Sequence, residues 1–93
     1  MAELTLDARV LVPDAVVARE VDGETVLLNL DTGIYFGLDA VGTEIWRAIQ
    51  LNGSLHDALA AVEGEYEVDR AVLSADLLQL VSRMLAKGLL QTT

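Results

Sequence analysis

Residues 26–46 read VLLNLDTGIYFGLDAVGTEIW, and this stretch decides the fold. Up to Leu38 it is rich in β-branched and aromatic residues, interrupted by the turn-forming residues 31–33. After Leu38 the apolar spacing changes from two to about 3.6, so that Val41 and Ile45 share one helical face. The stretch therefore predicts two antiparallel strands that lead directly into a helix.

Working outward, the first third of the chain predicts three strands, over residues 16–21, 25–30 and 33–38. Asp22-Gly23 is typical of a two-residue type I′ hairpin, and residues 31–33 fit a three-residue loop with glycine at the left-handed position. Because side chains alternate along a strand, Ile34, Phe36 and Leu38 are expected to face the helices. A short extended segment is expected at residues 10–12.

The second half predicts three helices, each preceded by a residue type that caps helix N-termini. The expected caps are Asp39, Ser54 and Asp69. The expected helix ends are Asn52-Gly53, Gly64 and Lys87-Gly88, with Leu89 and Leu90 folding back onto the last helix.

The third helix is apolar over an arc of about 160°, whereas one core needs a stripe of about 100°. Two explanations stay open: the helix packs centrally on both the sheet and the other helices, or it also lines a groove. The apolar residues are Leu73, Leu77, Leu78, Leu80, Val81, Met84 and Leu85.

Length and charge restrict the class of protein. Ninety-three residues, 53% hydrophobic and 23% charged, predict a single globular domain over residues 1–93 with a core from about 10 to 90. Fifteen acidic and six scattered basic residues give a net charge of −9, which disfavours nucleic acid and anionic membranes. Without a signal peptide or a spanning segment, the expected location is cytoplasmic.

Side chains suited to catalysis are scarce. The sequence has no cysteine, and its single histidine, His56, is expected on the surface of the second helix. The acidic residues between positions 63 and 69 lack the EF-hand pattern of a calcium loop. No nucleophile and base are paired by any motif, so we expect no enzyme activity, no cofactor and no metal.

Taken together, the stretch 26–46, the Ile45-Trp46 pair in the first helix and the late Gly88-Leu89-Leu90 resemble the PqqD family. The resemblance runs from about residue 10 to 90 and is nearest to the stand-alone members that serve lasso-peptide biosynthesis. Asp39 stands where the family usually has Asn and Val41 where it has Thr; both are helix-cap positions, and Asp caps as well as Asn. The implied fold is α+β: a winged helix-turn-helix-like domain with a three-stranded antiparallel sheet followed by three helices.

The resemblance implies a binding function rather than catalysis. Such a protein, a RiPP recognition element, captures the leader segment of a ribosomally made precursor peptide and presents it to a leader peptidase and other modifying enzymes. The leader adds as a strand beside residues 33–38 and packs against the third helix, which is consistent with the excess apolar arc. A DNA-binding winged helix is the alternative, disfavoured by the acidic charge.

The expected peptide-binding residues fall into three groups. Some lie on the edge strand. Three of these also have an explanation without a ligand: Phe36 fits the core, Gly33 fits a turn, and Tyr35 fits a cross-strand pair with the second strand. Others form the groove floor, and two lie at its rim. In that order the expected residues are Gly33, Ile34, Tyr35 and Phe36; Leu28, Leu30, Leu77, Leu80 and Met84; and Asp76 and Arg83.

Overall fold

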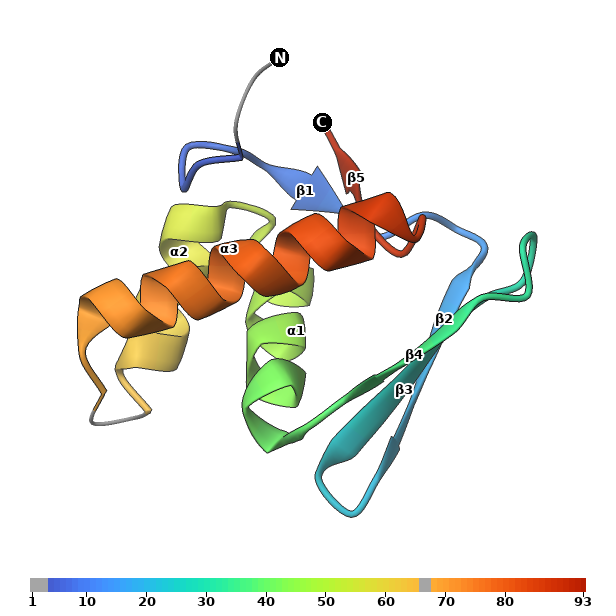
Figure 1. Cartoon of the computed structure of the whole chain (residues 1–93), viewed down its shortest axis with the longest axis horizontal. Helices are drawn as coiled ribbons and strands as arrows, with labels where there is room; N and C mark the ends of the chain where they lie inside the picture. Colours follow the sequence, from blue (N-terminus) through green and yellow to red (C-terminus); the bar gives the residue numbers. More distant parts are fainter. Residues whose placement is uncertain (1–3, 66–67) are drawn as a thin grey trace.

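A computed structural model describes residues 4–65 and 68–93, and it contains a three-stranded sheet, a two-stranded sheet and three helices (Figure 1). In Figure 1, α3 crosses the other two helices, and the three-stranded sheet stands to one side of them. In chain order the elements are β1 (Val10–Leu11), β2 (Val16–Val21), β3 (Glu24–Asn29), β4 (Tyr35–Leu38), α1 (Ala40–Asn52), α2 (Leu55–Glu63), α3 (Arg70–Ala86) and β5 (Gln91–Thr92).

The three-stranded sheet is the antiparallel meander β2-β3-β4 that the sequence predicts. Both residues of the first hairpin turn have positive φ, 55° at Asp22 and 82° at Gly23, as a type I′ turn requires. The second turn is longer than predicted. Gly33, at φ 75°, donates its N–H to the Asn29 carbonyl, and Ile34 donates to Thr32 Oγ1, so β4 begins only at Tyr35.

All three predicted helix caps are present. Asp39 accepts a hydrogen bond from the Gly42 N–H at 2.8 Å, and Ser54 and Asp69 cap α2 and α3 through their side-chain oxygens. At the far end of α3, Gly88 adopts φ 72° and the Leu89 N–H reaches back to the Met84 carbonyl at 2.9 Å. This closure turns the chain back and buries Leu89 and Leu90, as the sequence predicts.

The two-stranded sheet was not predicted. β1 pairs antiparallel with β5, so the segment expected only to be extended finds a partner at the C-terminal end of the chain. Two-residue strands are too short to leave a periodic pattern in the sequence.

A single apolar core joins the sheet to the helices. α1 packs against β3 and β4 and also against α2, while α3 packs chiefly on α2. Trp46 is buried in this core, as its place on the apolar face of α1 predicts. The larger core side chains are Leu27, Phe36, Leu38, Ile45, Trp46, Ile49, Leu55, Leu59, Val62, Leu73, Leu77, Val81, Met84, Leu89 and Leu90.

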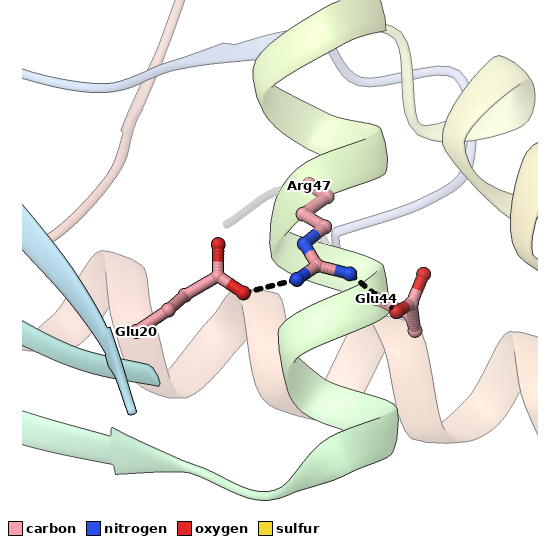
Figure 2. A network of polar contacts seen from close by, with 3 residues as sticks. All are labelled: Glu20, Glu44 and Arg47. Carbon is pink, nitrogen blue, oxygen red and sulfur yellow. Dashed lines mark hydrogen bonds and ion pairs between the residues drawn. The ribbon is translucent and has the colours of Figure 1, made fainter. Parts of the chain in front are cut away.

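An ion-pair network on the surface links β2 to α1 (Figure 2). The Arg47 guanidinium donates hydrogen bonds to Glu20 on β2 and, at 2.7 Å, to Glu44 one turn earlier on α1. The hydrogen bond to Glu20 and the charge of that carboxylate raise the pKa of Arg47 above its usual value. Arg47 therefore stays charged at any ordinary pH, and both of its partners lie on β2 and α1 rather than on β4.

Candidate functional site

A groove of about 500 Å³ lies between β4, the start of α1 and one face of α3. Its walls are contributed by the strand, by the residues that lead into α1, and by polar as well as apolar positions of α3. The lining residues are Phe36, Gly37, Leu38, Asp39, Val41, Gly42, Ile45, Asp76, Gln79, Leu80 and Arg83.

Helical periodicity divides α3 into a core face and a groove face. Asp76, Leu80 and Arg83, spaced four and three residues apart, all line the groove. The core face consists of Leu73, Leu77, Val81 and Met84, all buried. Leu78 and Leu85, half-buried, pack on the core from the opposite flank of α3. The wide apolar arc therefore serves the core, that flank and, through Leu80, the groove.

The predicted floor residues separate into two depths. Leu77 and Met84 are 0% exposed, so they belong to the core beneath the groove and do not reach its surface. Leu80 is half-buried and lines the groove. Asp76 and Arg83, expected at the rim, are exposed and line it as well.

The placement of Leu28 and Leu30 between the sheet and α3 was wrong. Thr25, Leu27 and Asn29 are the buried residues of β3, so Leu28 points to the opposite face of the sheet. There Leu28 lies with Val26 and residues of β2. Leu30 follows the end of β3 and is 62% exposed. Neither residue lines the groove.

The predicted strand residues also divide by face. Phe36 lines the groove while most of its surface is buried, whereas Tyr35, on the outer face opposite Leu28, is 74% exposed. Gly33 and Ile34 belong to the turn before β4 and do not line the groove. The alternation predicted for Phe36 and Leu38 is confirmed; Ile34 is 39% exposed because it precedes the strand.

The backbone of β4 is paired with β3 on one side only, within the part of the chain that the structure describes. The Asn29 N–H donates to the Ile34 carbonyl at 2.9 Å, and paired residues alternate between bonded and non-bonded in an antiparallel ladder. In this register Phe36 and Leu38 turn their backbone groups toward β3. The N–H and C=O groups of Tyr35 and Gly37 therefore point outward, along the free edge beside the groove.

Two cationic side chains, one in the last turn of α3 and one directly after the helix, stand over the aromatic ring of β4. The Arg83 guanidinium carbon is 5.0 Å, and the Lys87 ammonium nitrogen 6.0 Å, from the centroid of the Phe36 ring. Such distances allow a cation–π attraction. Phe36 and Arg83 thus mark one end of the groove, and Asp39 at the end of β4 belongs to the other.

Asn29 holds the groove together and was not singled out from the sequence. Its Oδ1 accepts hydrogen bonds from the N–H groups of Asp31 and Thr32, and its Nδ2 donates to the Gly88 carbonyl at 2.9 Å. One buried side chain thereby fixes the turn before β4 to the C-terminal end of α3. The sequence did hold a signal for this role: Asn29 lies two residues after Leu27, on the same face of the strand, and a polar residue that faces inward needs hydrogen-bond partners.

The acidic side chains, the single histidine and the helices bear on other classes of site. Residues 4–65 and 68–93 contain no group of three His, Cys, Asp or Glu side chains that could hold a metal ion. Glu67, part of the acidic run near α3, lies outside the described residues. His56 is exposed, as predicted, and its Nε2 lies 3.1 Å from Asp7 Oδ1. No helix in the described part of the chain is both long and apolar enough to cross a membrane.

The sheet, the helices and their order define a small α+β domain of the winged helix-turn-helix-like class, which confirms the predicted fold. The chain belongs to the PqqD family, because the model of that family, described as coenzyme PQQ synthesis protein D, matches residues 24–90. The resemblance seen in the sequence is thereby confirmed. Comparison with curated proteins gives no significant match.

Two solved structures resemble this chain along most of its length. TbiB1 in complex with the TbiA(beta) leader peptide is 41% identical, with a TM-score of 0.80 over 86% of this chain and 93% of that one. Lasso peptide synthetase B1 complexed with the leader peptide has a TM-score of 0.78 over 90% of this chain and 99% of that one. At 24% identity the second shows a common fold alone.

Proposed function

We propose that this protein binds the leader segment of a ribosomally synthesised precursor peptide and presents it to processing enzymes, as in lasso-peptide biosynthesis. The leader adds to the free edge of β4 as an antiparallel strand, and its inward side chains enter the groove beside α3. The observation on which this proposal rests is the coincidence of an open strand edge with an adjoining groove.

Backbone pairing provides affinity that does not depend on sequence. The outward N–H and C=O groups of Tyr35 and Gly37 offer an incoming strand one full set of ladder bonds at each residue. Gly37 has no side chain, and a Cβ placed there would meet nothing within 4 Å, so a second backbone has room to approach.

The groove provides selectivity. Alternate side chains of an added strand would point toward α3, where Leu80 and the partly covered ring of Phe36 offer apolar contact between charged residues. Leader binding itself is supported by similarity, because TbiB1, the 41% identical protein, has been solved in complex with a leader peptide.

The proposal includes partners that act after binding. A leader peptidase and a cyclase of the same pathway are the enzymes that receive the peptide, and the role of this protein is to bind and present it. The groove residues we assign to the leader are Phe36, Gly37, Leu80, Asp76 and Arg83. Tyr35 contributes from the strand, Gly33 and Ile34 from the turn before it, and Leu77 and Met84 support the groove from the core.

The two edges of one sheet provide the test. The probes are the TbiA(beta) leader peptide and a synthetic leader from any short precursor reading frame found beside this gene. Each is titrated into isotope-labelled protein while amide exchange is followed. We expect the Tyr35 and Gly37 amides to become protected. On β2 the Leu30 N–H donates to the Ala15 carbonyl, and with the β2-β3 register this places the amides of Ala18 and Glu20 on the outward side in the same way. The exchange rates of these two amides should stay unchanged. Protection on β2 or α2, or the absence of binding by both peptides, would refute β4 addition.

A further inference from the structure

The groove is lined by opposite charges at its two ends. Arg83 lies at the end near Phe36. Asp39, directly after β4, lines the same groove, and so does Asp76, which lies about 10 Å from Arg83 toward the start of α3. All three side chains are exposed at the groove rather than buried beneath it.

These charges are not neutralised by neighbours. The ion pairs found in the described part of the chain engage Arg47, Arg70 and His56, and none involves Asp39, Asp76 or Arg83. Asp39 caps α1 and Arg83 lies in the last turn of α3, where the helix dipoles contribute partial charges of opposite sign. Those partial charges amount to about half an elementary charge, so the sign at each end is set by the side chains.

The direction of a bound strand follows from the elements that border the groove. β4 runs from the Phe36–Arg83 contact toward Asp39, and in Figure 1 it runs opposite to α3 across the view. An antiparallel strand added to β4 would therefore begin at the acidic end and finish at Arg83. Its N-terminal part would meet Asp39 and Asp76, and its C-terminal part would meet Arg83 and Lys87.

We propose that this charge polarity selects the peptide and fixes its register: the bound segment carries Lys or Arg toward its N-terminal end and Asp or Glu toward its C-terminal end. The two residues share the face that points to α3, so their separation is even. With about 3.3 Å per strand residue and about 10 Å between Asp76 and Arg83 along α3, the separation is two or four residues. This inference rests on the proposed function and adds the substrate class to it.

The test is a selection from a displayed library of random twelve-residue peptides, carried out on the wild-type protein and on the double variant Asp76→Lys with Arg83→Glu. Wild-type selections should enrich a basic residue followed at two or four positions by an acidic one. Selections on the double variant should enrich the reversed order. Both substitutions together leave the net charge unchanged, so the matched control makes the same exchange outside the groove: Asp14→Lys with Arg19→Glu, at two exposed positions that do not line it, should select the wild-type pattern.

Affinities for individual selected peptides provide the quantitative arm. Each single groove variant should weaken a wild-type peptide by about two- to fivefold at 0.15 M salt, the range of exposed ion pairs, and the double variant should bind charge-reversed peptides best. Thermal unfolding of every variant confirms that the fold is kept.

The possible failures can be told apart. Peptides that protect the Tyr35 and Gly37 amides but show the same charge pattern on both proteins, or no charge pattern, overturn the polarity and leave the proposed function intact. A library that yields no binder, together with leader peptides that do not bind, overturns the proposed function and this inference with it.

Discussion

The closed core and the open groove are built from the same elements, and they differ in which residue each element turns toward them. α3 turns Leu77 into the core and Leu80 into the groove, and β4 turns Phe36 inward while the backbone of Gly37 faces the free edge. With 100° per residue, Leu80 lies only about 60° around the helix from Leu77. A small rotation separates a residue that holds the fold from one that is free to bind.

This arrangement gives the binding surface a rigid support. The strand edge is fixed by its ladder to β3, and Asn29 joins the adjacent turn to the end of α3. Strand and helix therefore hold their separation without a peptide between them. A groove held open in this way lowers the ordering cost of binding, which the peptide alone then has to meet.

Truncating the two leucines of α3 tests the division between core and groove most strongly. Leu77→Ala should lower the free energy of unfolding by about 2–5 kcal/mol, because it leaves a cavity in a fully enclosed position. Leu80→Ala removes a half-buried side chain and should cost less stability, while it reduces peptide affinity.

Urea unfolding and titration with the leader peptide, on the same preparations, make this comparison. The volume-conserving changes Leu77→Met and Leu80→Met serve as controls that should each cost under about 1.5 kcal/mol of stability. Equal losses of stability from both alanine variants, with affinity unchanged in Leu80→Ala, would mean that Leu80 is core like Leu77.

Asn29 joins the two regions, and its removal should have the next largest effect. Asn29→Ala leaves the Gly88 carbonyl without its donor and should lower the free energy of unfolding by about 1–3 kcal/mol. Asn29→Asp keeps the oxygen that accepts from the turn but replaces the donor with an oxygen facing that carbonyl. We expect burial and the facing Gly88 carbonyl to disfavour ionisation of this carboxyl more than the two turn N–H groups favour it, so its pKa should be raised in the folded state.

The sign of the pH effect follows. A carboxyl whose pKa is higher in the folded than in the unfolded state favours folding when protonated, and that benefit is lost as the pH rises through its folded value. The deficit of Asn29→Asp relative to the wild type should therefore be smaller at pH 4 than at pH 7, whereas the deficit of Asn29→Ala should not follow this titration. Urea unfolding of all three proteins at both pH values measures it, and parallel behaviour of the two variants would contradict the role given to Nδ2.

The sequence predicted most of the fold because its local signals agree with one another. The turns at Asp22-Gly23 and Gly33 need positive φ, which these residue types adopt readily. The helices are capped by Asp39, Ser54 and Asp69. Both outcomes follow from short-range chemistry. The free edge of β4 was predictable as well, since the last strand of a three-stranded meander has one neighbour.

The detail of the groove was not predictable because it depends on which face of each strand is turned inward. Leu28 is apolar and Asn29 polar, so composition alone favours Leu28 as the inward residue, yet Asn29 is buried. Its three hydrogen bonds make burial acceptable, and two of those partners are backbone groups in the turn while the third is 59 residues away. The pairing of β1 with β5 likewise joins residues far apart in the sequence, which a local pattern cannot predict.

Proline substitutions on the two outer strands should give the smallest effect and the sharpest distinction. Proline has no N–H, and it is tolerated in an edge strand where that N–H faces solvent. Gly37→Pro and Ala18→Pro each remove an N–H that points away from β3, so both should keep the free energy of unfolding within about 1 kcal/mol of the wild type.

Only Gly37→Pro removes a donor that the leader uses, and it should weaken leader binding by about 0.5–1.5 kcal/mol, the net value of one hydrogen bond. Isothermal titration of both variants with the same leader peptide measures the difference. Equal affinity for the two variants would place the peptide elsewhere than β4, and a selective loss in Ala18→Pro would place it on β2.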